Sequence, residues 1–283
     1  MIPDLLKTYY STLDSDFHSL YAGLTDEGGQ KNVHALRVNV KKHLAFFRLM
    51  ASLDKDFPKK EVSQPFRVFR SFTGEQRDLE VGIGLLIKQE KKLGLPADYS
   101  MTLLRRHRRH AVSLKKIEEK LPAGTTQQVA KKVMARIETL PGEAGLRTYL
   151  HIYFLNKLER SAKCVEAALL ECNENALHKL RMHIKELMLN LTVLQIMAPP
   201  GPGFPNFKKH LDNLQDLLGD WHDLHVLRTN MEAEGKSVSK KLRNAVRKEE
   251  KLCLHQVEDD LKSFTSLHLE ALQVLKDLLM QKN

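Results

Sequence analysis

The amino-acid sequence predicts an all-α protein, a duplicated helical bundle made of two antiparallel half-bundles with pseudo-twofold symmetry. Three observations predict it. Apolar residues recur at helical spacing almost throughout the 283 residues, and we find no convincing two-residue alternation typical of a strand. Two sequence blocks occur twice at nearly the same offset, which indicates a duplicated unit. With 42% hydrophobic residues, the chain can also bury a substantial core.

Glycine and proline interrupt the helical pattern and set the expected helix ends. Pro141-Gly142 is the expected boundary inside one domain, which would consist of repeat halves 1–141 and 142–283. The helices expected in the first half are Pro3–Tyr21, Lys31–Leu53, Lys59–Phe72, Glu75–Leu93, Ala97–Leu121 and Thr125–Leu140. Those expected in the second half are Glu143–Glu171, Asn175–Met197, Pro205–Leu218, Asp220–Glu234 and Ser237–Gln281.

The first repeated block lies on a long expected helix in each half. It reads VHALRVNVKKHLA at Val33–Ala45 and LHKLRMHIKELML at Leu177–Leu189, 144 residues later. Both copies share a histidine, a leucine, an arginine, a β-branched residue and a lysine at equivalent positions. These residues are His34, Leu36, Arg37, Val40 and Lys41 in the first copy, and His178, Leu180, Arg181, Ile184 and Lys185 in the second.

A second block follows each copy of the first. It reads GEQRDLEV at Gly74–Val81 and GDWHDLHV at Gly219–Val226, an offset of 145 residues. We expect the shared aspartates, Asp78 and Asp223, to cap a helix or to orient neighbouring cations. If these aspartates act as internal counter-ions, they neutralise the basic residues themselves, which is the alternative to neutralisation by an anionic ligand.

The basic residues of the first block form a stripe on one side of their helix. At about 100° per residue, His34, Arg37, Lys41 and Arg48 fall within an arc of roughly 60°. Apolar residues flank this arc on both sides, whereas the charges of an ordinary surface helix lie opposite its apolar side. His178, Arg181 and Lys185 repeat the arrangement. We infer that both stripes face a shared, partly enclosed surface, where acids of the chain or an anionic ligand must neutralise them.

The remaining polar residues of the two helices are expected to face water. In the first copy these are Asn39, Lys42 and His43, and in the second they are Lys179, His183, Glu186 and Asn190.

Further basic residues support an anionic partner. The chain carries 45 Lys and Arg against 35 Asp and Glu, a formal net charge of +10. Arg offers a planar fork and Lys a point charge for phosphate oxygens, so the mixture suits a phosphate ligand. Each basic run alone is more typical of a solvated helix surface than of a binding site. The candidates beyond the stripes are Arg105, Arg109 and Lys116 in the first half, and Lys240, Arg243 and Arg247 in the second.

Catalytic, metal and cofactor sites find no support in the sequence. It contains no P-loop, no GxSxG elbow, no acidic cluster for Mg²⁺ and no Cys/His metal set, so we expect a protein that is not an enzyme. His34 and His178 are read either as hydrogen-bonded structural residues or as donors to an anion. Three scattered cysteines, no signal peptide and no apolar run of membrane-spanning length favour a cytoplasmic protein without a membrane partner.

Together, the two blocks resemble the CHAD domain, the conserved histidine α-helical domain, over essentially the whole chain. The resemblance implies a duplicated all-helical bundle that binds inorganic polyphosphate through a basic central surface. It assigns polyphosphate contacts to His34, Arg37 and Lys41 and to their equivalents His178, Arg181 and Lys185. One turn later, where the family commonly has another basic residue, this chain has Leu44 and Met188. We therefore expect a smaller cationic surface in the second half.

The leading hypothesis is a non-catalytic module that binds polyphosphate, for recruitment to polyphosphate granules or for buffering of free polymer. Nucleic-acid binding is the runner-up, but only 6% of residues are aromatic, and no basic stripe is interleaved with stacking residues. Two further hypotheses are a polyphosphate-processing enzyme and a pure scaffold whose stripes are neutralised by internal acids. The sequence does not identify a protein partner.

Overall fold

The computed structural model is all-helical over the residues that it describes, which are 2–24, 29–109, 114–171, 173–197, 204–235 and 238–280. Eleven helices lie within these ranges, and none of the described residues forms a strand. The helices are α1 (Ile2–Ala22), α2 (Gly29–Leu53), α3 (Lys59–Phe72), α4 (Gly74–Leu93), α5 (Asp98–Arg109), α6 (Leu114–Lys120), α7 (Ala123–Glu138), α8 (Glu143–Glu171), α9 (Glu174–Met197), α10 (Phe204–Ala233) and α11 (Lys240–Met280).

Most predicted helix boundaries are confirmed to within a few residues, but two predictions are wrong. The segment 97–121 contains two helices, α5 and α6, separated by residues outside the described ranges. The predicted break at Gly219 is absent, because α10 runs through it. Glycine inside a helix costs only about 1 kcal/mol, and here the buried side chains of Leu218 and Trp221 hold both neighbouring turns in the core.

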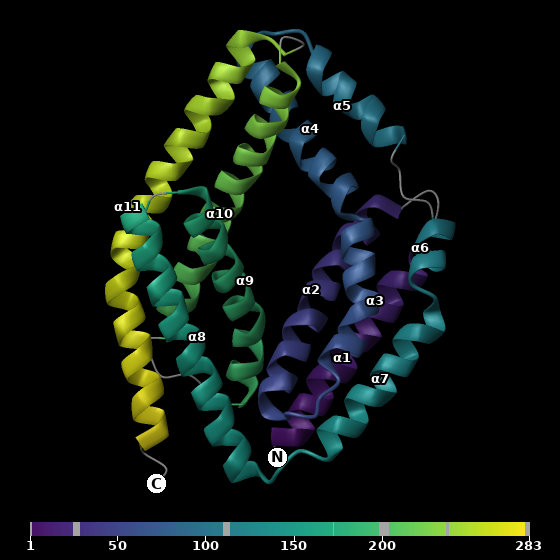
Figure 1. Cartoon of the computed structure of the whole chain (residues 1–283), viewed down its shortest axis with the longest axis vertical. Coiled ribbons are helices and arrows are strands. Elements are labelled where there is room, and N and C mark those ends of the chain that lie inside the picture. Colours follow the sequence, from purple (N-terminus) through teal and green to yellow (C-terminus); the bar gives the residue numbers. More distant parts are fainter. Residues whose placement is uncertain are drawn as a thin grey trace.

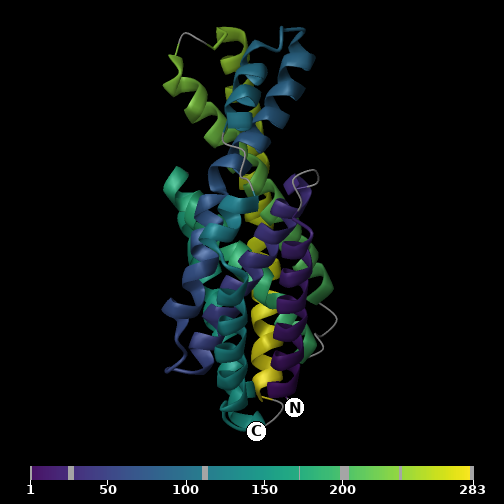
Figure 2. The same ribbon diagram turned by 90° about the vertical axis from the view of Figure 1, so that its right-hand side faces the viewer.

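The helices form two groups that meet along α2 and α9 (Figure 1). In the first group α1 and α3 pack against α2, and α7 packs against α1 and α3. In the second group α8 and α10 pack against α9, and α11 packs against α8 and α10. At the far end of the molecule, α4 packs against α10 and α11. Figure 2 shows the elongated shape that results, with α1 beginning at the same end of the molecule at which α11 ends. The pseudo-twofold relation between the halves stays a prediction.

Helix α2 is covered on more sides than its sequence pattern predicts. Asn39 and His43, which we expected to face water, are only 4% and 0% exposed. Helix α1 covers this side, where the Asn39 side-chain amide donates a hydrogen bond to the Leu13 carbonyl at 3.0 Å. The His43 ring stacks on Phe66 at a centroid distance of 4.6 Å, and burial lowers the pKa of His43 to about 3. His43 is therefore a neutral core residue, and only Lys42 of the three is exposed.

Helix α9 shows the same departure from the prediction. Asn190 is 2% exposed and donates a hydrogen bond to the Tyr153 hydroxyl of α8 at 2.8 Å. Glu186 is also largely enclosed, with a side-chain exposure of 16%. Lys179 is exposed and His183 half-buried. In both copies the helix that precedes the motif packs over the side that was expected to face water.

No helix of the described residues combines the length and the apolar character needed to cross a membrane.

Candidate functional site

A large cleft separates the two groups of helices. It has a volume of about 1310 Å³ and lies between α2, α3 and α4 on one side and α9 and α10 on the other, with α5 at one end. Nine Arg or Lys residues line it against five Asp or Glu, so its lining is cationic. The basic residues are Arg37, Lys41, Arg48, Arg67, Arg70, Arg77, Arg106, Arg181 and Lys185, and the acidic residues are Glu75, Asp78, Glu186, Asp223 and Glu234.

The lysines of the two motif copies meet in this cleft. Because α2 packs against α9, Lys41 and Lys185 line the same cleft. Burial lowers the pKa of Lys41 to about 7, and the charges of Lys185, Arg37 and Arg70 act in the same direction. Burial likewise lowers the pKa of Lys185, helped by Arg181 and Arg70. The prediction that the two stripes face a shared surface is confirmed for these residues.

Arg37 lies deeper than the lysines and has a structural role as well. It is 8% exposed, and its Nη1 donates to the Arg70 carbonyl at 2.9 Å and to the Thr73 hydroxyl at 2.6 Å. The Thr73 hydroxyl in turn donates to the Phe69 carbonyl at 2.9 Å. A helix end leaves carbonyl groups without intrahelical partners, so Arg37 holds the C-terminal end of α3 in place while its side chain lines the cleft.

Arg181, the equivalent residue in α9, is not held in this way. It lines the cleft, and burial lowers its pKa. Within the described part of the chain, neither Arg181 nor Arg70, Lys41 or Lys185 has a carboxylate within the 4.0 Å of an ion pair. These four half-buried cations are therefore the part of the site with the greatest unbalanced charge.

Asp78 and Asp223 offset this charge only in part. Both line the cleft, and burial raises the pKa of each carboxyl group. The charge of Asp78 favours protonated Arg37, and that of Asp223 favours protonated Arg181. Neither aspartate forms an ion pair with another described residue. The two aspartates therefore act as nearby counter-ions, but they do not neutralise the cleft completely.

Arg48 is the one stripe residue with a direct acidic partner among the described residues. Its Nη1 lies 3.5 Å from Glu186 Oε2, and Glu186 Oε1 accepts a hydrogen bond from Lys157 Nζ at 2.6 Å. Glu186, expected to face water, instead joins α8, α9 and α2 at the edge of the cleft. Part of the Arg48 charge is therefore already neutralised.

The predicted histidines occupy different positions. His34 lines the cleft, and burial followed by the charge of Arg77 lowers its pKa. His178 is exposed and does not line the cleft, but its ring lies 5.6 Å from the ring of His222, which does. Burial and the charge of Arg181 lower the pKa of His222 to about 4.

The other predicted cations do not line the cleft. Arg105, Arg109, Lys116 and Lys240 are exposed elsewhere on the surface. Arg243 donates to the Gly235 carbonyl at 3.0 Å. Arg247 forms an ion pair with Glu232 at 2.8 Å. The helical spacing of these residues identified basic surfaces without indicating whether a neighbouring helix supplies a partner.

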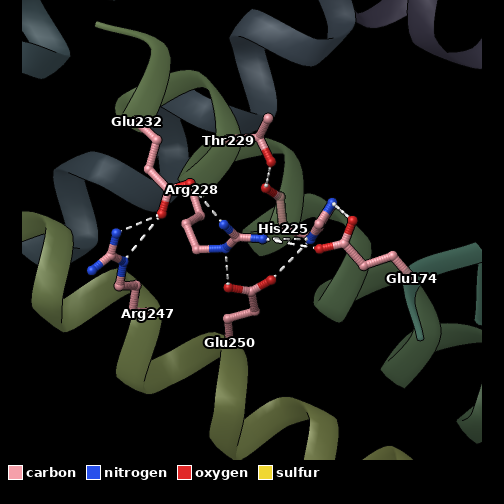
Figure 3. A network of polar contacts seen from close by, with 7 residues as sticks. All are labelled: Glu174, His225, Arg228, Thr229, Glu232, Arg247 and Glu250. Atoms are coloured by element: carbon pink, nitrogen blue, oxygen red, sulfur yellow. Dashed lines mark hydrogen bonds and ion pairs between the residues drawn. The ribbon is translucent and has the colours of Figure 1, made fainter. Parts of the chain in front are cut away.

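Figure 3 shows the network of ion pairs and hydrogen bonds to which Arg247 belongs. Glu232 also binds Arg228, and Arg228 Nε donates to Glu250 of α11 at 2.6 Å. The His225 ring lies between Glu250 and Glu174, at 3.0 and 3.3 Å. This network joins α10 to α11 and to the start of α9, so it supports one wall of the cleft from behind.

Several cleft residues were not predicted from the sequence. Arg67 and Arg70 lie three residues apart on α3 just before the second block, and Arg77 lies inside that block. The helical spacing of these arginines could have identified them from the sequence as candidates for the basic surface. Arg106 closes one end of the cleft through an ion pair with Glu234 at 2.7 Å, a contact across 128 residues that no local pattern indicates.

The chemistry of the cleft suits the holding of an anion. It offers Arg and Lys donors from both groups of helices, and no cluster of His, Cys, Asp or Glu able to hold a metal occurs among the described residues. Charge-assisted hydrogen bonds from such donors to phosphate oxygens are roughly twice as strong as neutral ones.

A comparison with protein families agrees with this site. The family model of the CHAD domain matches residues 19–232, a range that contains both copies of each repeated block. A search of curated proteins found no match. The match covers most of the 283 residues and nearly all of the cleft lining. The chain therefore belongs to the CHAD domain family.

Proposed function

We propose that this protein binds inorganic polyphosphate in the cleft between its two groups of helices and holds it without catalysis. The CHAD domain is associated with polyphosphate binding in general. The observation that carries the proposal here is the crowding of Lys41, Arg70, Arg181 and Lys185 without a paired carboxylate among the residues that the structure describes. Half-buried like charges repel each other, and an anion placed among them removes that repulsion.

The size of the cleft favours a single polymer strand over a nucleic-acid duplex. Its volume of about 1310 Å³ is close to that of small-molecule sites, which run to about 1,000 Å³. A duplex would have to bind on the outside, where basic residues such as Arg247 already have acidic partners. A polyphosphate chain presents phosphates without bases and needs no aromatic stacking surface.

The test is calorimetric titration of the full chain with long-chain polyphosphate, single-stranded DNA and duplex DNA at matched phosphate concentration. We expect selective binding of polyphosphate that weakens as salt rises, because binding releases counter-ions from the polymer. Equal affinity for all three polymers would reduce the cleft to a generic basic surface. Absence of binding would favour the scaffold hypothesis.

Two variants locate the site. Arg181→Ala removes a cleft cation that has no hydrogen-bonded partner in the described part of the chain, and we expect at least about a tenfold loss of affinity, the scale of one charge-assisted contact. Arg105→Ala removes an equal charge from the exposed surface outside the cleft. The proposal requires the first loss to exceed the second clearly, and equal losses would contradict it.

Recruitment to polyphosphate granules is the cellular role that this binding supports. A fluorescent fusion of the full chain should concentrate on granules, and the Arg181→Ala fusion should remain dispersed. Release of phosphate from the polymer by the purified protein, with or without Mg²⁺, would contradict a purely non-catalytic role.

A further inference from the structure

We propose that Thr73 is a positioning residue for phosphate recognition in the cleft. Its hydroxyl holds one end of the Arg37 guanidinium, so that the opposite edge, formed by Nε and Nη2, is left to bind two oxygens of one phosphate group. The inference deepens the proposed function and rests on it for the identity of the anion. It follows from three hydrogen bonds at the corner between α3 and α4.

The backbone and the hydroxyl proton of Thr73 are fixed by contacts other than the one to Arg37. Thr73 is the single residue between α3 and α4, and it is 0% exposed. Its N–H donates to the Phe69 carbonyl at 3.0 Å, and its carbonyl accepts from the Arg77 N–H at 3.4 Å, so both helices hold it. Its hydroxyl donates to the Phe69 carbonyl at 2.9 Å. Because a hydroxyl has one proton, Thr73 offers Arg37 a lone pair in a set direction.

The corner occupies only one nitrogen of the guanidinium group. Arg37 Nη1 donates to the Thr73 hydroxyl at 2.6 Å and to the Arg70 carbonyl at 2.9 Å, which uses both of its hydrogens. Neither Nε nor Nη2 donates to another residue of the described ranges. Because Arg37 lines the cleft, three N–H donors remain for an anion.

These remaining donors have the geometry that phosphate recognition requires. The Nε hydrogen and one Nη2 hydrogen lie parallel on one edge of the planar group, which matches two oxygens of a carboxylate or a phosphate. Arg136 binds in this way elsewhere in the chain, since its Nε and Nη2 donate to the two carboxylate oxygens of Asp54 at 2.6 Å each. Asp78 lines the same cleft as Arg37 but forms no ion pair with it, so this edge has no carboxylate partner among the described residues.

The second half of the chain lacks the hydroxyl. At the offset of 145 residues between the second blocks, Leu218 stands in the position of Thr73. A leucine side chain accepts no hydrogen bond, and Leu218 is buried in the core within the unbroken helix α10. Arg181 accordingly has no hydrogen-bonded partner in the described part of the chain. Arg37 is therefore ordered before binding, whereas the ligand must order Arg181, and ordering a long side chain weakens binding.

The test compares the affinity of full-length variants for long-chain polyphosphate by calorimetry. Thr73→Val keeps the shape of the side chain and removes the hydroxyl, and we expect about a fivefold loss of affinity, the scale of ordering one long side chain. Thr73→Ser keeps the hydroxyl and should stay close to the wild type.

Ser161→Ala is the matched control. The Ser161 hydroxyl is also buried and donates to the carbonyl four residues earlier, that of Lys157, at 2.9 Å, but Ser161 does not line the cleft. This variant loses the same kind of hydrogen bond and should keep its affinity. A loss in Thr73→Val no larger than that in Ser161→Ala would overturn the proposal.

A second background shows whether Thr73 acts through Arg37. Arg37→Lys keeps the positive charge but has no pair of parallel donors. Addition of Thr73→Val to Arg37→Lys should therefore cause no further loss of affinity. The same further loss in this background as in the wild type would mean that Thr73 affects the cleft by another route, and the positioning role would be wrong.

Nuclear magnetic resonance of the arginine side chains keeps the two proposals apart, because it needs no ligand. We expect slow rotation of the Arg37 Nη1 group in the free wild type, faster rotation in Thr73→Val, and fast rotation at exposed Arg105 in both. Fast rotation at Arg37 in the wild type would overturn the positioning role even if no variant folds. Slow rotation without any binding of polyphosphate would retain that role and contradict polyphosphate as the ligand. Equal binding of polyphosphate by wild type and Thr73→Val would do the reverse.

Discussion

Lys41 and Lys185 lie 144 residues apart in the sequence, yet both line the cleft where α2 packs against α9, and the charge of Lys185 helps to lower the pKa of Lys41. They occupy the same position in the two copies of the repeated motif. Proteins normally avoid such pairs, because two half-buried cations repel each other and lose hydration. The pair should therefore lower the stability of the free protein, and it leads to specific expectations.

Polyphosphate binding should be linked to proton uptake. The pKa of Lys41 is lowered to about 7 in the free protein, and a bound polyanion raises it again by favouring the charged form. Affinity should therefore fall as pH rises above about 7, and calorimetry near pH 7.5 in buffers of different ionisation enthalpy should report uptake of up to about one proton per site. Long chains keep the contribution of the terminal phosphates small. Binding without any dependence on the buffer would contradict this prediction.

The charge of Lys41 should destabilise the free protein. Its folded pKa of about 7 is below the usual value, so the unfolded chain binds the proton more tightly between about pH 7 and 10.5. The cost is complete below pH 7 and disappears as pH rises to about 10.5. Lys41→Met should thus raise the free energy of unfolding by about 1–2 kcal/mol at pH 6.5, after discounting for partial exposure, and by less at pH 9.5.

Urea denaturation at the two pH values measures this difference. Lys42→Met is the matched control, because Lys42 is adjacent but exposed. A gain in the Lys41→Met variant that is the same at both pH values would point to added apolar contact rather than relief of charge.

Arg37 and Arg181 should differ although they are equivalent in sequence. Arg37→Ala removes hydrogen bonds to the Arg70 carbonyl and the Thr73 hydroxyl, so we expect a loss of about 1.5–3 kcal/mol, the scale of a hydrogen bond to a charged group. Arg181→Ala removes the repulsion from the other cleft cations together with the longer-range attraction of Asp223, but no hydrogen bond to a described residue, so its melting temperature should stay equal or rise. Thermal unfolding of the two purified variants provides the comparison. Similar destabilisation of both would show that Arg181 also has a structural partner.

Glu186→Gln, at the edge of the cleft, should lower the stability of the free protein and increase its stabilisation by polyphosphate. Glu186 is the partner of Lys157 and Arg48, and its loss leaves both cations unneutralised. Removing one partner of a largely buried pair costs about 3–5 kcal/mol, so the free variant should melt at a lower temperature. Polyphosphate should raise the melting temperature of the variant more than that of the wild type, because more cations become available.

Glu232→Gln is the control for this experiment. It also breaks two ion pairs, with Arg228 and Arg247, but these are more exposed and lie in the network away from the cleft. We expect a lower melting temperature here too, but the same polyphosphate-induced increase as in the wild type. An equal change in both variants would mean that Glu186 does not restrict the site.

The local pattern of the sequence was sufficient to predict the helices and the first members of the site. Helical periodicity depends on residues three and four positions apart, so most helix ends were found to within a few residues. The repeated motif identified Lys41, Arg181 and Lys185 because each copy places its basic residues on one side of a helix between apolar flanks. The match to the CHAD domain family confirms the resemblance that these blocks indicated.

The tertiary structure decided which side of each helix is covered and which charge has a partner. Asn39 and His43 are buried because α1 packs over them, Arg247 is engaged because Glu232 lies on the neighbouring helix, and Arg70 joins the site because α3 ends against Arg37. A single helix carries its own periodicity, but burial and charge pairing depend on residues more than ten positions away. The sequence by itself therefore determined the helices and the repeated cations, and only the packing of α2 against α9 made those cations a site.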